Sequence, residues 1–171
     1  DYTKAIELDP NNSIAYNNRG LAKYDLEDYK GAIEEYTKAI ELDPNYALAY
    51  NNRGLSKYFL ADYRGAIADY DKSITNDPQN ANFYSDRGAA KIFSKDYGGA
   101  LQDYKQSIKI DPNYSKPYAG RALVKYLTRD FNGAINDSRK ALTYNPQDYS
   151  ALSTLGRSQY EIGEKTDACS N

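Results

Sequence analysis

A repeat of 34 residues runs through this chain of 171 residues and constrains its fold more than any other feature. Five prolines mark the repeat, and each lies 34 residues after the one before: Pro10, Pro44, Pro78, Pro112 and Pro146. Tyrosine, glycine and alanine return at fixed offsets between them, for example at Tyr50, Gly54, Ala66 and Tyr70. A period of this length is typical of arrays in which each unit is one supersecondary structure that stacks on its neighbours. The sequence therefore predicts an elongated array.

Each copy of the repeat is expected to hold two helices. Apolar residues such as Ile33, Tyr36 and Ile40 recur at intervals of three and four, which is the spacing of a helix face. The expected boundaries are 13–46, 47–80, 81–114 and 115–148 for four complete repeats, 1–12 for the second helix of a preceding repeat and 149–171 for an incomplete fifth repeat. Because the chain begins at Asp1 without an initiator methionine, we expect it to be a piece of a longer protein.

Local signals place the ends of these helices. An aspartate that can accept from free backbone N–H groups precedes the second helix of each complete copy, at Asp28, Asp62, Asp96 and Asp130. The repeated prolines end that helix, because proline cannot continue it and disfavours helix in the residue before. Within each hairpin, small residues such as Gly20 and Ala32 are expected to let the two helices approach closely.

These motifs resemble the tetratricopeptide repeat over essentially the whole chain. The resemblance rests on the 34-residue period, the Tyr-x-x-x-Gly and Ala-x-x-x-Tyr-x-x-Ala spacings and the Asp-Pro-Asn step that ends a copy. It implies an all-α fold, a right-handed superhelical solenoid of antiparallel helix pairs. It also implies a protein–protein interaction scaffold that binds a peptide or protein segment in the concave groove formed by its first helices.

The chain departs from the family pattern at a position usually filled by a large apolar residue. Four copies carry arginine there, with an acid sixteen residues later. The fifth copy changes both positions, to Leu155 and Asn171, together with the lysine that follows the arginine, which becomes Gln159. We expect an internal ion pair in each complete copy, with solvated surface charges as the alternative. The pairs are Arg19 with Glu35, Arg53 with Asp69, Arg87 with Asp103 and Arg121 with Asp137.

A second departure lies between the two helices. The glycine that the family usually has there is kept only as Gly163, and Glu27, Ala61, Lys95 and Arg129 replace it in the complete copies. We therefore expect the ends of those first helices to be less favourable.

The resemblance assigns a peptide-binding groove to the first helices. Asparagine amides can both donate to and accept from a peptide backbone, and tyrosine offers apolar area with a polar tip. The alternative is that these are ordinary exposed residues of a helix. The matching positions are Asn17, Asn18, Tyr24, Asn51, Asn52, Tyr58, Phe59, Asp86, Phe93, Lys116 and Tyr126.

One mode of peptide binding known in the family is not expected in this chain. Members that clamp the terminal carboxylate of chaperones use lysine, arginine and asparagine at set positions of three successive repeats. Of these positions in the first three copies only Asn52 matches, and Asp86 would repel a carboxylate. Starting one copy later retains one cation, Lys116.

The alternative function is a structural module that associates with itself, stacking head to tail. Residues 1–85 hold 14 acidic and 9 basic residues, whereas residues 86–171 hold 10 acidic and 13 basic residues. End-to-end stacking would bring opposite charge together and would propagate instead of closing. A regulatory or substrate-docking domain of a larger enzyme is a further possibility.

The composition provides few residues of the types that catalysis and metal binding usually require. The chain has no histidine and a single cysteine, Cys169, so we expect no catalytic residues, no metal site and no cofactor. A net charge of −2 argues against nucleic acid as the main partner. No apolar run approaches the roughly 18 residues that a membrane span needs. The compartment is left open, with the cytoplasm favoured.

Overall fold

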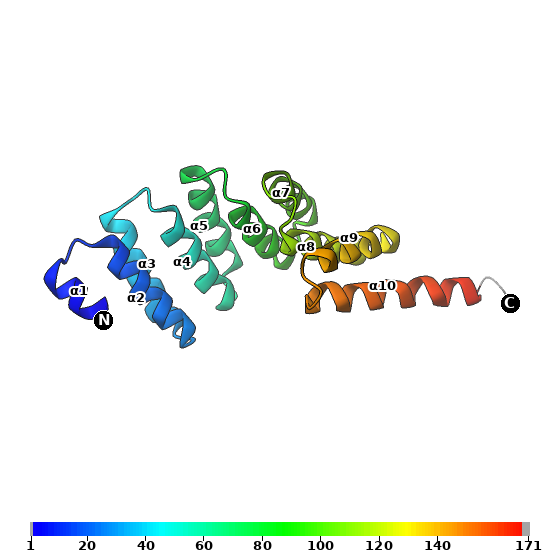
Figure 1. Ribbon diagram of the computed structural model, residues 1–171, viewed down its shortest axis with the longest axis horizontal. Coiled ribbons are helices and arrows are strands. Elements are labelled where there is room, and N and C mark those ends of the chain that lie inside the picture. The colour runs from blue at the N-terminus through cyan, green and yellow to red at the C-terminus, as the bar shows by residue number, and fades with distance from the viewer. Residues whose placement is uncertain (1, 169–171) are drawn as a thin grey trace.

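A computed structural model describes residues 2–168 of the chain, with side chains described as far as Gly163. This part is all-helical and contains no strand, which confirms the predicted fold class (Figure 1). Its helices are α1 (Tyr2–Leu8), α2 (Ser13–Asp25), α3 (Tyr29–Leu42), α4 (Ala47–Phe59), α5 (Tyr63–Asn76), α6 (Ala81–Phe93), α7 (Tyr97–Ile110), α8 (Ser115–Leu127), α9 (Phe131–Tyr144) and α10 (Tyr149–Ala168). None of these helices is long and apolar enough to cross a membrane.

The helices form hairpins that stack side by side into a curved array. The pairs α2–α3, α4–α5, α6–α7 and α8–α9 each pack together, and each second helix also packs on the first helix of the next pair (Figure 1). First helices of successive pairs contact one another as well, whereas second helices of successive pairs do not within the described residues. The first helices α4, α6 and α8 therefore line the inner side of the curve.

The second helices begin at the predicted caps. The Oδ1 atom of Asp62 accepts from the backbone N–H of Gly65 at 2.9 Å, and Asp28, Asp96 and Asp130 make the same bond in their repeats. Glycine recurs three residues after each of these aspartates, because a Cβ on Gly65 would collide with the Asp62 carboxylate.

The turn between the two helices of a hairpin is strained. Glu27, Ala61, Lys95 and Arg129 all have positive φ, between 60° and 67°, which is the left-handed region that glycine adopts most easily. These are the four positions where the family's glycine is replaced.

Ala61→Gly is expected to raise the free energy of unfolding by about 1 kcal/mol, because glycine removes the steric cost of φ 61°. Ala22→Gly, at an exposed position inside α2, is the matched control and is expected to lower it by about 1 kcal/mol. Urea denaturation of both variants measures the difference. Equal losses in the two would contradict the assignment of strain to the turn.

The fifth copy differs from the expectation of a helix pair interrupted at residue 171. Helix α10 is continuous from Tyr149 to Ala168 and passes through Gly163, where the other copies turn. The aspartate that caps the second helix elsewhere is Glu164 in this copy, so the signal that starts a new helix is absent. Cys169 and Asn171 lie outside the described residues.

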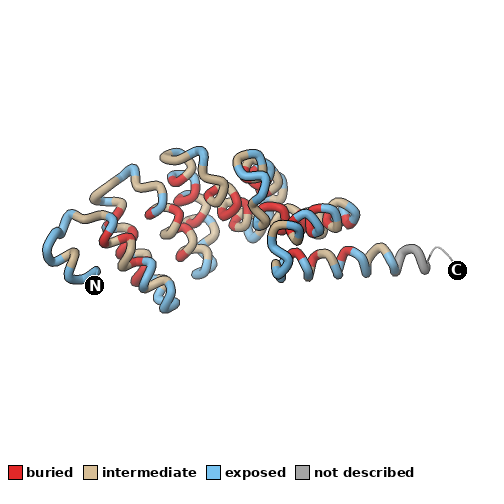
Figure 2. Tube along the Cα trace, viewed as in Figure 1, coloured by how far each residue is buried: buried red, intermediate tan, exposed pale blue. Residues whose placement is uncertain are grey.

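The core is a series of layers between hairpins (Figure 2). Tyr36, Tyr70 and Tyr104, one from each of three second helices, are at most 2% exposed. Tyr70 packs with Ala66 of its own helix and Ala90 of the next hairpin, and its ring lies against Gly54 of α4. A Cβ on Gly54 would lie 2.9 Å from Cε1 of Tyr70, so glycine is required there for the helices to approach. The tyrosine layers bind neighbouring repeats together.

Candidate functional site

A column of ion pairs follows the hairpins from α2 to α9. In the second repeat, Arg53 donates from Nε and Nη2 to the two carboxylate oxygens of Asp69 at 2.9 and 2.7 Å, and Nζ of Lys57 lies 2.7 Å from Oδ2. The acid of each set has a side chain at most 9% exposed. The same arginine–acid–lysine set recurs as Arg19–Glu35–Lys23, Arg87–Asp103–Lys91 and Arg121–Asp137–Lys125.

Two of the arginines also reach the preceding repeat. Arg53 donates from Nη1 to Oγ1 of Thr37 at 3.1 Å, and Arg87 donates from Nη1 to Oδ1 of Asp71 at 2.7 Å. Burial alone would lower the pKa of Arg87, but the hydrogen bonds and charges of Asp103 and Asp71 outweigh it and raise that pKa. Sequence reasoning considered pairs within a hairpin and did not anticipate this link between hairpins. The column thus joins the two helices of each hairpin and, at Arg53 and Arg87, one hairpin to the preceding one.

The asparagines of the predicted groove do not all face it. Asn17 and Asn51 are 3% and 4% exposed, so the structure places their amides inside the contacts between first helices and not on the open surface of the groove. The Oδ1 atom of Asn17 accepts from Nδ2 of Asn52 at 3.0 Å, and Asn51 donates from Nδ2 to Oδ2 of Asp86 at 3.3 Å. These amides join the first helix of one repeat to that of the next. Asn18 and Asn52 remain half-buried on the inner helices.

Asp86 and Lys116 were predicted as ligand contacts, but the structure pairs them with each other. Nζ of Lys116 donates to Oδ1 of Asp86 at 2.7 Å, and Nδ2 of Asn82 donates to Oδ2 at 3.1 Å. Asp86 is 4% exposed, whereas the side chain of Lys116 is 52% exposed. Burial would lower the pKa of Lys116, but the adjacent Asp86 carboxylate outweighs it and raises that pKa. Lys116 is therefore a charged group at the groove whose charge is already balanced.

Aromatic rings form a contiguous series where first helices end and second helices begin. Phe59 stacks on Tyr29 with ring centroids 5.2 Å apart, and Phe93 stacks on Tyr63 at 4.8 Å. Phe59 and Phe93 are about half exposed, at 51% and 54%. We call this series the aromatic edge, and it consists of Tyr24, Tyr29, Tyr58, Phe59, Tyr63 and Phe93. Sequence reasoning missed Tyr29 and Tyr63, although their return every 34 residues beside the helix cap was a usable signal.

Tyr126 lies apart from this series. Its ring is 5.8 Å from that of Phe131, and the two residues line a separate hollow of about 200 Å³ with Leu127, Arg129 and Glu161.

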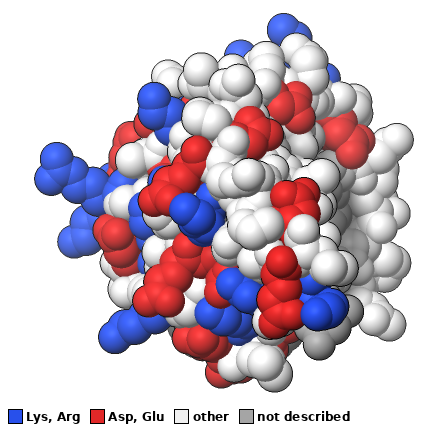
Figure 3. Space-filling view, turned by 90° about the vertical axis from the view of Figure 1, so that its left-hand side faces the viewer, with Lys and Arg blue, Asp and Glu red and all other residues white. Residues whose placement is uncertain are grey.

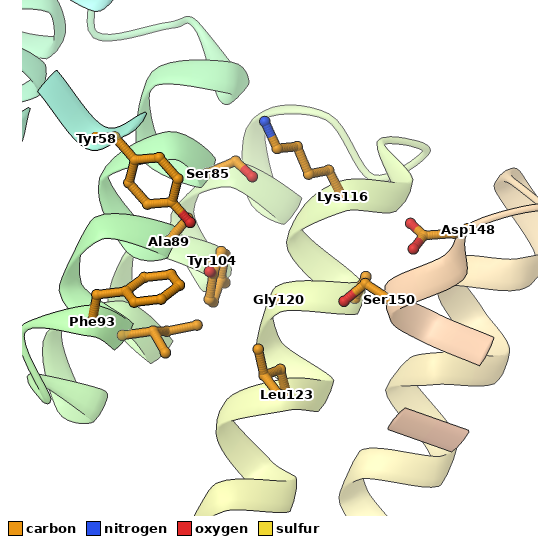
Figure 4. Close-up of a pocket in the computed structure, with 12 residues that line it drawn as sticks. Tyr58, Ser85, Ala89, Phe93, Tyr104, Lys116, Gly120, Leu123, Asp148 and Ser150 are labelled. Carbon is orange, nitrogen blue, oxygen red and sulfur yellow. The ribbon is translucent and has the colours of Figure 1, made fainter. Parts of the chain in front are cut away.

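An apolar hollow of about 290 Å³ opens on the inner face between α6 and α8 (Figure 4). We call it the Gly120 hollow. Tyr104 lies between α6 and α8, and Lys116 and Asp148 both lie on the side of α8 and α10, across from Tyr58 and Phe93 (Figure 4). Its lining residues are Tyr58, Ser85, Ala89, Ile92, Phe93, Tyr104, Lys116, Ala119, Gly120, Leu123, Asp148 and Ser150.

A second hollow of about 210 Å³ adjoins the first toward the N-terminal end. It shares Tyr58, Ala89 and Lys116 with the Gly120 hollow and adds Leu55 and Phe59. Together the two hollows make a groove across α4, α6 and α8, to which we refer as the inner groove. Of the predicted residues, the inner groove brings together Tyr58, Phe59, Asp86, Phe93 and Lys116.

Three family models match the chain. They are described as tetratricopeptide repeat or TPR repeat and match residues 1–34, 20–59 and 51–115, so that together they cover residues 1–115 without a gap. No curated protein sequence matches the chain.

Solved structures of repeat proteins share the fold. The crystal structure of MamA superposes with a TM-score of 0.76 at 24% identity, covering 85% of each chain. YrrB, described as a TPR protein with an unusual peptide-binding site, gives 0.75 at 20% identity and covers 95% of this chain and 84% of its own. The first TPR domain of Spaghetti (RPAP3), bound to the HSP90 peptide SRMEEVD, gives 0.65 at 22% identity and covers 68% and 93%. At these identities the likeness concerns the fold.

Proposed function

The chain belongs to the tetratricopeptide repeat family, and on this premise we propose that it is a protein-interaction scaffold whose inner groove binds an extended peptide or protein segment. The role is one of binding rather than catalysis. YrrB and the RPAP3 domain, which share the fold, are described with a peptide-binding site and with a bound peptide.

The observation that carries the proposal is the pair of adjoining hollows on the inner helices. They expose apolar groups of Leu55, Tyr58 and Phe93 next to the charged amine of Lys116. Concave, mostly apolar surfaces with a few polar groups are where proteins bind ligands. An extended segment laid across the first helices would contact both hollows.

The occupant is not expected to be a clamped terminal carboxylate. The one cation retained from that mode, Lys116, already pairs with Asp86 at 2.7 Å. To reach Lys116, a ligand carboxylate would have to displace the buried Asp86 or bind beside it. Two carboxylates so close together repel each other. A segment bound through apolar side chains and its backbone fits the inner groove better.

Leu55→Glu is expected to weaken binding of peptides selected against the chain from a random display library by at least about tenfold, because it places a charge on the apolar wall of the inner groove. Leu26→Glu makes the same change at a residue 81% exposed in a turn outside the groove and is expected to leave affinity unchanged. Fluorescence anisotropy with labelled peptides measures both. Equal affinity of the two variants would contradict the proposed function.

A second candidate is self-association through α1 and α10. Exposed apolar side chains on both helices favour it, because Leu8 is 77% and Leu152 47% exposed. The charge argument for head-to-tail stacking is weaker, since acidic and basic side chains are interspersed on the end that carries α1 (Figure 3). Sedimentation equilibrium over a wide range of protein concentration tests this candidate, and a constant monomer mass would remove it.

A further inference from the structure

We propose that the Gly120 hollow is a specificity pocket for one aromatic side chain that carries a hydrogen-bonding group, a tyrosine or a tryptophan of the bound segment. This inference rests on the proposed function and adds what the inner groove selects. It concerns a feature of this chain's own residues, because Ala89 and Gly120 differ from the residues at the same positions of the neighbouring copies.

The hollow exists because two side chains are missing from facing helices. Ala89 of α6 stands at a position that is leucine in three other copies, at Leu21, Leu55 and Leu123. Gly120 of α8 stands at a position that is Asn52 or Asp86 in the two copies before it. Ala89 leaves open the space that leucine would fill, and Gly120 lets the ring of Tyr104 approach α8, so that both departures shape the same hollow.

Gly120 cannot be replaced by a larger residue without moving the ring beneath it. A Cβ there would collide with Cζ of Tyr104 and would lie 2.6 Å from its hydroxyl oxygen. Tyr104 is 2% exposed and is held between Gly88 and Gly120, so its ring forms a fixed floor. An open space above a fixed ring, with Phe93 and Leu123 as walls, accommodates a flat side chain.

Ser85 supplies the polar element of the pocket. It is 1% exposed and lines the hollow, and its Oγ atom is buried without a hydrogen bond of standard geometry. The nearby phenol of Tyr114 directs its own proton to Oδ1 of Asn82 at 2.7 Å, so its oxygen offers Ser85 only a weak contact, which slightly opposes the rise that burial causes in the pKa of Tyr114. Buried hydroxyls nearly always have a partner, and an unpaired one is costly. A tyrosine hydroxyl or a tryptophan N–H entering the hollow would give Ser85 that partner, whereas phenylalanine or leucine would leave it unpaired.

Polar groups at the rim fit a bound backbone. Lys116, Asp148 and Ser150 line the hollow on the side of α8 and α10 (Figure 4). The Oδ1 atom of Asp148 caps α10 by accepting from the N–H of Ala151 at 3.0 Å. The charges of Lys116 and Asp148 suit the mixed donors and acceptors of a peptide, and the apolar interior suits its anchoring side chain.

The test uses twelve-residue peptides selected against the whole chain from a random display library. The selected sequences are expected to share tyrosine or tryptophan at one position, and its replacement by alanine is expected to cost at least about tenfold in affinity. Ala89→Leu fills the hollow with the residue that other copies carry, so the variant is expected to fold and to lose affinity to the same extent. Ala22→Leu, at an exposed position of α2, is the matched control and is expected to bind as the wild type does.

Ser85→Ala separates the polar element from the apolar pocket. Because no hydrogen bond of standard geometry holds the serine hydroxyl in the free protein, its loss is expected to leave folding unharmed. It is expected to weaken peptides with tyrosine or tryptophan by about 3- to 10-fold and to leave the same peptides with phenylalanine unchanged. Thermal melting of each variant confirms that it is folded.

The possible outcomes distinguish the proposed pocket from the proposed peptide-binding function of the inner groove. Peptides that lose affinity with Leu55→Glu but bind Ala89→Leu as tightly as wild type would overturn the pocket and leave the proposed function standing. Equal effects of Ser85→Ala on tyrosine, tryptophan and phenylalanine peptides would overturn the role of Ser85. Failure to select any binding peptide would overturn the proposed function together with the pocket.

Discussion

Asp69→Asn is expected to lower the free energy of unfolding by about 3 kcal/mol, one of the largest effects of any single polar substitution in the array. The asparagine keeps the size of the side chain but removes the charge that balances Arg53 and Lys57. The two cations are 17% and 23% exposed, so water screens them only in part. This places the cost at the lower end of the range for breaking a buried ion pair.

The fifth copy of the repeat supplies a matched rescue. It carries Leu155 and Gln159 where the second copy has Arg53 and Lys57, and asparagine where the second copy has Asp69. The triple variant Arg53→Leu, Lys57→Gln and Asp69→Asn transfers this set into the second copy. It is expected to recover most of the lost stability in urea denaturation, because no unpaired charge is left. A triple variant no more stable than Asp69→Asn would contradict a coupled set of charges.

Tyr70→Ala is expected to lower the free energy of unfolding by about 3–5 kcal/mol, because it empties a fully buried ring site between two hairpins. The ring packs on Ala66 and on Ala90 of the next hairpin, so the cavity lies in the interface between repeats. Tyr70→Phe keeps the ring and is the control, with an expected loss below about 1 kcal/mol.

Tyr70→Ala also tests how strongly neighbouring repeats are coupled. Neighbouring repeats stabilise one another in a solenoid, so weakening one interface lowers the cooperativity of the whole. Native-state hydrogen exchange is expected to show α1–α4 and α6–α9 opening at different free energies in Tyr70→Ala but together in Tyr70→Phe. Uniform exchange in Tyr70→Ala would contradict an array coupled through its tyrosine layers.

The sequence was sufficient for the architecture because the repeat carries local signals. The prolines, the capping aspartates and the Tyr–Gly spacing each act within one hairpin, so their effect can be read from one copy. The arginine and acid sixteen residues apart likewise belong to one hairpin, and the structure brings Arg53 within 2.7 Å of Asp69. In the fifth copy the aspartate that starts the second helix elsewhere is replaced by Glu164, and α10 runs without a turn to Ala168.

The candidate site was harder to predict because it depends on contacts between copies. Whether Asn51 faces solvent or Asp86 is decided by the angle between α4 and α6, which the sequence does not state. The Gly120 hollow combines a small residue of one copy with a small residue of the next, and either one alone would be unremarkable. Once the stacking of the hairpins is known, the hollow can be located from Ala89 and Gly120, because these residues are smaller than those at the same positions of other copies.

The most direct test of the central claim is backbone chemical-shift mapping of a display-selected peptide on the whole chain. If stacked hairpins leave their inner helices for a ligand, shift changes at saturation will lie on α4, α6 and α8, with the largest around Ala89 and Gly120. Changes concentrated on α5, α7 and α9 would contradict the account.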